Sequence, residues 1–186
     1  MTMTTVPSHK QRYSATAMSL HWLIALMIVV GFYIGWIMTD IPGFTPTKLK
    51  YFSWHKWIGV TVFVLSAIRL AWRLTHRAPA LPSGIAPVQK LAAEATHVIL
   101  YLLMFAIPVT GYLYSSAAGI QVVYLGILPL PTLIGPDTAL KVVLKTVHIW
   151  LNYTLLALVI LHVLAALKHQ FVDRDGLLAR MIPFFK

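Results

Sequence analysis

The stretch TALKVVLKTVHIWLNYTLLALVILHVLAALKH, residues 138–169, decides the fold of this chain. It is long enough to cross a lipid bilayer, because a membrane-spanning helix needs about 20 predominantly apolar residues. Two histidines, His148 and His162, lie fourteen residues apart within it. Since an α-helix has about 3.6 residues per turn and a rise of about 1.5 Å per residue, both imidazoles face roughly one side, about 21 Å apart along the axis. One helix therefore offers an imidazole near each side of the membrane, where such a group is costly and usually functional.

Three more apolar segments accompany this one, at about residues 17–39, 54–75 and 94–116. Hydrophobic residues make up 59% of the 186-residue chain and charged residues 11%, which is typical of membrane proteins. Because no alternating strand pattern or repeat is present, the sequence predicts an all-α fold, a transmembrane four-helix bundle that forms a single domain over residues 1–186. We expect its helices at about 14–39, 47–75, 90–116 and 138–169.

Lysine and arginine are distributed unequally between the two ends of the predicted bundle. With four spans, both termini lie on the same side as the loop over residues 76–93. That side holds ten of the fifteen basic residues, so the positive-inside rule predicts that both termini are cytoplasmic. The outer side holds five basic residues and only two acids, Asp40 and Asp137; such a face attracts anions, although anchoring to lipid headgroups explains it equally well. The inner ten are Lys10, Arg12, Arg69, Arg73, Arg77, Lys90, Lys168, Arg174, Arg180 and Lys186, and the outer five are Lys48, Lys50, Lys56, Lys141 and Lys145.

Two further histidines lie in predicted spans at depths that match His148 and His162. Counted from the helix ends, His21 lies near the inner side with His162, and His55 lies near the outer side with His148. Two imidazoles on facing helices can bind one haem iron, which gives an electron-transfer centre with no open coordination position. Because the chain has no cysteine, such a haem is not attached covalently. One such histidine could be structural, but four at matched depths favour ligands; zinc is a weak alternative because zinc ligands cluster.

Other side chains are candidates for contact with such a cofactor. Arg69 lies fourteen residues after His55, at the inner depth, where haem propionates are suitable bidentate acceptors. Arg12 is a second candidate for this contact. His97 lies near the same depth and could compete as a ligand, although we prefer a supporting role or contact with a quinone. His169 is expected to contact a lipid headgroup or a propionate.

Two features of the chain bear on packing. Gly31 and Gly35 form a GxxxG pattern, which usually allows close packing of helices and could alternatively make room for a flat cofactor. Residues 117–138 are long and apolar for a loop, and we expect them to lie on the outer membrane surface or to cap the bundle.

Four pieces of the sequence, taken together, resemble the bacterial cytochrome b561 family, and the resemblance covers nearly the whole chain. The family is related more distantly to the cytochrome b subunits of nickel–iron hydrogenases and formate dehydrogenases. The resemblance implies a four-helix bundle with two b-type haems, axial ligands at His21, His55, His148 and His162, and electron exchange with quinone. The pieces are HWL at 21–23, HKWIG at 55–59, HVILYLLMFAIPVTGY at 97–112 and ALKHQFVDRDGLLARM at 166–181.

The resemblance also implies a function. Members of this family have been described as superoxide oxidases that reduce ubiquinone, whereas the eukaryotic proteins of the same name have six helices and use ascorbate. We therefore expect a multi-pass protein of the bacterial inner membrane that passes electrons from a periplasmic one-electron donor, with superoxide as a candidate, to ubiquinone. One alternative is a haem-binding membrane-anchor subunit that serves a periplasmic partner protein, and another is a haem-free transporter or scaffold. We expect no nucleic-acid partner.

Overall fold

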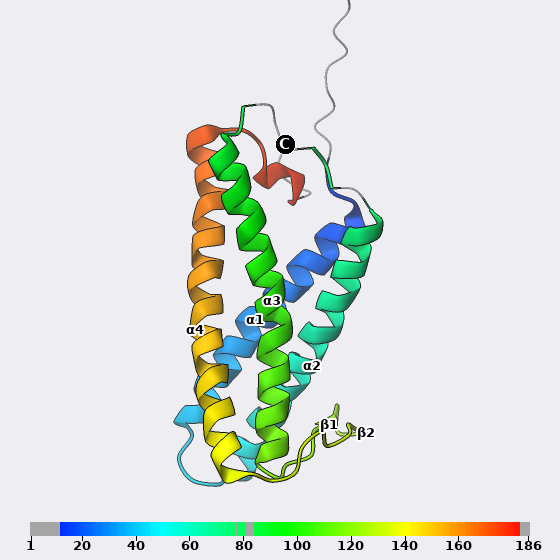
Figure 1. Ribbon diagram of the computed structural model, residues 1–186, viewed down its shortest axis with the longest axis vertical. Helices are drawn as coiled ribbons and strands as arrows, with labels where there is room; N and C mark the ends of the chain where they lie inside the picture. The colour runs from blue at the N-terminus through cyan, green and yellow to red at the C-terminus, as the bar shows by residue number, and fades with distance from the viewer. Residues whose placement is uncertain (1–11, 77, 81–83, 183–186) are drawn as a thin grey trace, which may run out of the picture.

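Four long helices form the molecule in the computed structural model, which describes residues 12–76, 78–80 and 84–182 (Figure 1). Their bounds agree with the predicted ones to within three residues at each end. By length and composition each could cross a membrane, and the prediction of an all-α four-helix bundle is confirmed. Lys10, Arg77 and Lys186, which count toward the predicted orientation, lie outside the described residues. The helices are α1 (Ala15–Asp40), α2 (Pro46–Thr75), α3 (Pro87–Ala117) and α4 (Thr138–Lys168), and a π-helical turn, η1 (His169–Asp173), continues α4.

Local side-chain bonds explain where three of the helices begin. The hydroxyl of Ser14 accepts a hydrogen bond from the Ala17 amide, and Thr45 does the same for Lys48. The carboxylate of Asp137 accepts from the Leu140 amide at 2.9 Å. Each of these caps satisfies an amide that has no partner within its own helix, so the turn residues before α1, α2 and α4 define their first turns.

The helices are arranged as two close pairs. Helix α1 packs along α2, and α3 packs along α4, while α2 and α3 join the pairs less extensively. Among the described residues, direct backbone contacts between α4 and either α1 or α2 are few. The pair α1–α2 is close at Gly31, where an added Cβ would lie 3.3 Å from the Cγ2 atom of Ile58. Side chains that connect α4 to α1 and α2 therefore act across the boundary between the two pairs.

Large apolar side chains cover the outside of the bundle. Leu26, Val29, Leu102 and Leu161 are all more than half exposed, whereas few hydrophobic residues in the described part of the chain are buried. A water-soluble domain rarely exposes so much contiguous apolar surface. The distribution is the one expected for helices whose outer faces contact lipid.

One end of the bundle, which we call the hairpin end, carries the connection between α3 and α4. This connection contains a short antiparallel pair of strands, β1 (Val123–Tyr124) and β2 (Leu128–Pro129). Three residues, 125–127, separate the strands, and Leu125 and Gly126 both have the positive φ angles that tight hairpin turns use. The segment was expected to be a surface or capping loop, and it does lie against α2. Its strands were not predicted, because two residues are too few to produce an alternating pattern.

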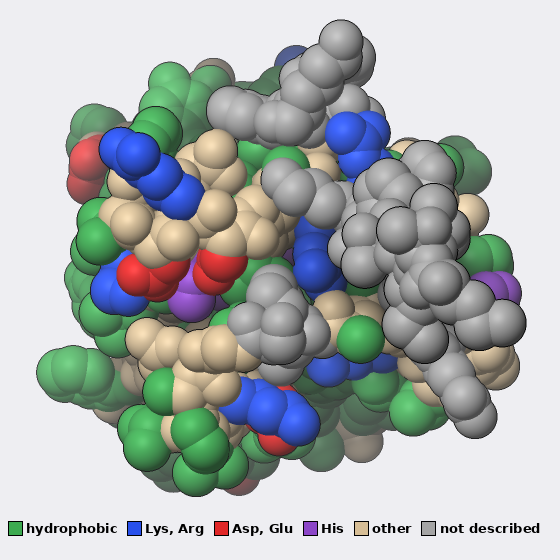
Figure 2. Space-filling model, turned by 90° about the horizontal axis from the view of Figure 1, so that it is seen from above, with side chains coloured by type: hydrophobic (Ala, Val, Ile, Leu, Met, Phe, Trp, Pro, Cys, Tyr) green, Lys and Arg blue, Asp and Glu red, His purple; other side chains and the backbone are tan. Residues whose placement is uncertain are grey.

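The opposite end, which we call the tail end, carries both ends of the described chain. After η1 the chain reverses at Arg174 and Gly176, both with positive φ, and forms a 3-10 turn, η2 (Leu178–Arg180). We call residues 169–182 the tail. In Figure 1 the tail runs from the top of α4 toward the start of α1. Figure 2 shows this end face, where basic side chains are scattered and a few acidic ones gather beside a histidine.

Candidate metal centres

The structure brings four histidines together as two pairs, in the combination expected from their depths. At the tail end, the ring centroids of His21 on α1 and His162 on α4 lie 6.3 Å apart. At the hairpin end, those of His55 on α2 and His148 on α4 lie 6.2 Å apart. Each pair spans the boundary between the two helix pairs, and α4 contributes one histidine to both.

The spacing of each pair fits an iron ion bound between two imidazoles. A metal–nitrogen bond of about 2 Å, with about 1.1 Å from nitrogen to ring centre, separates the centroids of two opposite ligands by about 6.2 Å. Both pairs have this separation within 0.1 Å. The donor set, two neutral imidazoles on facing helices, also suits haem iron, so the residues present fit a haem at either end.

Hydrogen bonds fix both rings at the hairpin end. The Nδ1 atom of His55 lies 3.1 Å from the carbonyl oxygen of Gly31, and that of His148 lies 3.0 Å from the carbonyl oxygen of Ile107. The hydroxyl of Thr110 lies 3.2 Å from the same Nδ1 of His148. When Nδ1–H donates to a carbonyl, Nε2 keeps its lone pair for a metal, as in most metal-binding histidines.

A glycine makes room for each of these rings. Gly35 and Gly111 each follow the accepting carbonyl by four residues, which is about one helical turn. A Cβ at Gly111 would lie 3.0 Å from Cε1 of His148, and one at Gly35 would lie 3.3 Å from Cε1 of His55. The GxxxG pattern therefore serves close packing at Gly31 and space for an imidazole at Gly35.

The tail-end pair is held differently. In the part of the chain that the structure describes, no hydrogen bond fixes the ring of His21 or His162. The ring of His97, on α3, lies 5.5 Å from that of His162. This is shorter than the spacing of about 6.2 Å that two ligands on opposite sides of one iron need. His97 is therefore placed to contact His162 directly, which agrees with the supporting role preferred for it; its role stays a prediction.

Arg69 lies beside the same group of histidines. Its Nη1 donates a 2.7 Å hydrogen bond to the Ala17 carbonyl of α1, and its charge interacts with His21, His97 and His162. It therefore places a fixed positive charge next to the tail-end pair, at the depth expected from its position fourteen residues after His55. Arg12, the second candidate, precedes α1 at the same end.

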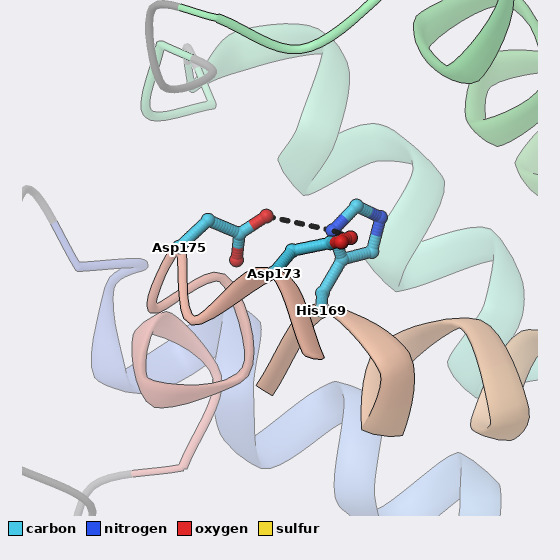
Figure 3. A group of neighbouring side chains, drawn as sticks. All are labelled: His169, Asp173 and Asp175. Carbon is cyan, nitrogen blue, oxygen red and sulfur yellow. Dashed lines mark hydrogen bonds and ion pairs between the residues drawn. The ribbon is translucent and has the colours of Figure 1, made fainter. Parts of the chain in front are cut away.

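His169 has partners that the sequence reading did not expect. Its Nδ1 lies 2.6 Å from an oxygen of Asp175 and 3.1 Å from one of Asp173 (Figure 3). The Lys168 ammonium pairs with Asp173 at 2.6 Å, so this carboxylate also has a lysine of the protein as its partner. His169 therefore takes part in an ion cluster where α4 meets the tail, and the expected headgroup or propionate contact stays a prediction.

The bundle has imidazole pairs at two depths, and one helix supplies one imidazole to each pair. This arrangement is typical of a class of membrane-bound b-type cytochromes. The chain belongs to one family of that class. It matches the model of prokaryotic cytochrome b561 over residues 12–184. Membership makes it a multi-pass bacterial membrane cytochrome that binds haem b and functions in electron transport.

Individual relatives cover nearly the full length of the chain. It is 32% identical to cytochrome b561 homolog 2 of Escherichia coli over 98% of this chain and 95% of the relative. It is 30% identical to the probable superoxide oxidase CybB of Yersinia pestis, over 94% and 97% of the respective chains. Cytochrome b561 homolog 1 of Escherichia coli is 29% identical, over 92% and 97%.

Proposed function

We propose that this protein holds two haem b groups and transfers electrons between a periplasmic one-electron donor and ubiquinone in the bacterial inner membrane. His55 and His148 would hold one haem, and His21 and His162 the other. Both termini are assigned to the cytoplasm, so the hairpin end faces the periplasm.

The observation that carries this proposal is the presence of two imidazole pairs with the same spacing, 6.3 and 6.2 Å, at opposite ends of one bundle. Haem iron with two imidazole ligands supplies reversible one-electron transfer without binding oxygen at the metal. Helix α4 holds one imidazole of each pair at a separation set by its own geometry. The lipid-facing helices keep both pairs out of water, and the Arg69 charge favours the more electron-rich state at the tail end.

The charge at the hairpin end supports an anionic donor. Lys48 donates to the Ile41 carbonyl and Lys50 lies over the ring of Trp54, so those two are engaged locally. Lys56 follows His55 directly, and within the described residues it has no acidic partner; Lys141 and Lys145 have none either. Cations without an acidic partner at this end raise the encounter rate of an anion. The relative named as a probable superoxide oxidase makes superoxide the first donor to test, with the protein then acting as a superoxide:ubiquinone oxidoreductase.

The tail end supports a site for the acceptor. Three imidazoles, from α1, α3 and α4, and the Arg69 guanidinium gather there. His97 contacts His162 without occupying a ligand position, so it is free to donate a hydrogen bond to a quinone carbonyl. We assign His97 and Arg69 to the ubiquinone side, and Arg12 to the same end.

The protein is proposed to act without a dedicated periplasmic subunit. At the hairpin end, only residues 41–45 and 118–137 connect the helices. These segments offer little surface for a large partner, which disfavours the membrane-anchor alternative. Co-purification of a stoichiometric periplasmic protein would favour that alternative.

The test is the haem content of the detergent-purified protein, measured from the alkaline pyridine difference spectrum. We expect two b-type haems per chain in the wild type. His148→Ala should lose mainly the hairpin-end haem and His162→Ala mainly the tail-end haem. One haem in the wild type, or two in both variants, would contradict the proposal.

A further inference from the structure

In each pair, the histidine on α1 or α2 has a tryptophan within two residues of it in the sequence. The indole of this tryptophan donates a hydrogen bond to a segment outside the four helices. The indole of Trp22, next to His21, donates to the carbonyl of Met181 in the tail at 2.8 Å. The indole of Trp57, two residues after His55, donates to the carbonyl of Val123 in the hairpin at 2.7 Å. The hairpin lies in the connection between α3 and α4, and the tail follows α4, so each bond connects a histidine-bearing helix of the α1–α2 pair to a segment attached to the α3–α4 pair.

The tail is anchored at both of its ends. Within the tail, Asp175 accepts a hydrogen bond from the Leu177 amide at 3.0 Å. It also contacts His169, the residue that follows the end of α4, at 2.6 Å (Figure 3). At α1, the Tyr13 amide donates to the carbonyl of Arg180 at 3.3 Å, in addition to the Trp22 bond. Few backbone contacts join α1 and α4 directly among the described residues, so these bonds connect the end of α4, through the tail, to the start of α1.

The two histidine pairs differ in how much they depend on such a connection. At the hairpin end, the rings of His55 and His148 are each bonded to a carbonyl of a neighbouring helix. At the tail end, no ring bond of this kind is present on His21 or His162 in the described part of the chain. The separation of the tail-end rings therefore depends on how α1 and α4 are held relative to each other.

We propose that the tail positions the tail-end imidazole pair through the Trp22–Met181 hydrogen bond and the Asp175 anchor. Trp22 and Asp175 are positioning residues, since neither contacts a metal in the proposed arrangement. Trp22 acts through its neighbour His21, whose ring it meets edge-on at 5.2 Å between centroids. The inference rests on the proposed function only in taking the two pairs to be haem ligands.

The first test is Trp22→Phe in the full-length protein, with Trp57→Phe as the matched control. Both changes keep an aromatic ring and remove the N–H donor. We expect the tail-end haem to be lost about fivefold faster to an excess of haem-free acceptor protein, which is the factor for one hydrogen bond of ordinary net strength. Its electron paramagnetic resonance signal should also shift, while the hairpin-end haem keeps its rate and signal in both variants. His21→Ala and His55→Ala identify which signal belongs to which end.

Asp175→Asn is the second variant, because it keeps the side-chain volume and weakens the anchor without touching α1. It should act in the same direction and on the same haem as Trp22→Phe. Equal loss from both ends, or no change at the tail end in either variant, would overturn the inference. If Trp57→Phe accelerated haem loss at the hairpin end to a comparable extent, the hydrogen bonds of the His55 and His148 rings would not be sufficient to hold that pair. This result would also overturn the inference.

A readout without haem separates this inference from the proposed function. The chain has no cysteine, so two introduced cysteines carry spin labels at unique positions. Leu23 on α1 and Leu161 on α4 are exposed and lie next to the two tail-end histidines. Trp22→Phe and Asp175→Asn should broaden the distribution of distances between these labels, and Trp57→Phe should not. Two haems in the wild type together with an unchanged distance distribution in the variants would support the proposed function and reject the positioning role of the tail. A broadened distribution in a protein that binds no haem would support the positioning role and reject the proposed function.

Discussion

Gly111 on α3 and His148 on α4 approach so closely that a Cβ at position 111 would lie 3.0 Å from Cε1 of the imidazole. The same imidazole is bonded through Nδ1 to the carbonyl of Ile107, one turn earlier on α3. The Ile107 carbonyl and Gly111 therefore both meet the Nδ1–Cε1 edge of the ring, which cannot move away from a larger residue at 111 without breaking that bond. This relationship makes the glycine a determinant of where Nε2 points.

Gly111→Ala should consequently reduce haem at the hairpin end and spare the tail end. Forcing one extra methyl into a packed interior costs about 1–3 kcal/mol, which corresponds to at least about fivefold weaker retention if the ring absorbs the strain. Gly35→Ala should have a smaller effect of the same kind, because its Cβ would lie 3.3 Å from His55. The effects of the two substitutions are measured as haem content per chain and as the rate of haem loss.

Gly59→Ala provides the control for these two variants. An added Cβ at Gly59, in the middle of α2, meets nothing within 4 Å. Haem content should match the wild type. If Gly59→Ala and Gly111→Ala lost haem equally, the effect would come from helix backbone changes and not from contact with the imidazole.

The imidazole planes of each pair are close to perpendicular, at 71° at the tail end and 84° at the hairpin end. If each pair holds a haem iron, perpendicular imidazole planes would leave the two iron d orbitals that overlap with the imidazole π systems nearly equal in energy. The oxidised protein should therefore give two highly anisotropic low-spin signals in electron paramagnetic resonance, with no rhombic signal of the kind that parallel planes produce. Two rhombic signals would contradict the ring orientations described above.

Arg69→Gln should lower the midpoint potential of the tail-end haem. A fixed positive charge favours the reduced form, which carries one positive charge fewer, so its removal makes reduction harder. At roughly 10 Å in an effective dielectric of about 20, one charge changes the potential by an amount on the order of 50 mV. Spectroelectrochemical titration measures the shift. Arg69→Lys keeps the charge and should stay near the wild-type potential; an equal shift in both variants would assign the effect to the lost Ala17 bond instead.

Lys56→Gln should slow reduction by an anionic donor. Lys56 follows His55 in α2 and has no acidic partner in the described part of the chain. Steering by such a charge is screened by salt. The second-order rate constant with superoxide should fall about two- to fivefold at low ionic strength and approach the wild-type value at high ionic strength. Lys50→Gln, which removes a lysine held over Trp54, is the comparison. A reduction that is independent of salt would argue against steering.

The sequence predicted the helices well because hydropathy and end signals are local. Fourteen-residue spacing in one span predicted that His148 and His162 share a face, and depth counting predicted which histidine faces each of them. These inferences need only the geometry of a single helix and a common membrane thickness. The family resemblance, which the comparison with prokaryotic cytochrome b561 confirms, depended on motifs spread along the whole chain.

The hydrogen bonds that position the imidazole rings and the tryptophans could not be predicted from the sequence, because they join residues 24 to 159 positions apart. Nothing local marks Ile107 or Gly31 as the carbonyl that bonds a histidine, since every residue has a carbonyl. The N–H partners of Trp22 and Trp57 are backbone atoms of irregular segments, which no local pattern identifies. A weak signal did exist for Gly111: like Gly35, it is a glycine inside an apolar span.

Helix α4 carries one histidine of each pair, so the distance between the two histidine pairs is set by the covalent chain and not by packing between helices. An insertion or deletion of one residue between His148 and His162 would turn the second imidazole by about 100° around the axis, away from His21. Substitutions between them, on the face exposed to lipid, would leave that relationship intact. Over these thirteen positions the length of the chain is therefore constrained far more tightly than its composition. Natural variation on the lipid-facing side of this segment should consist of exchanges among apolar residues without gaps.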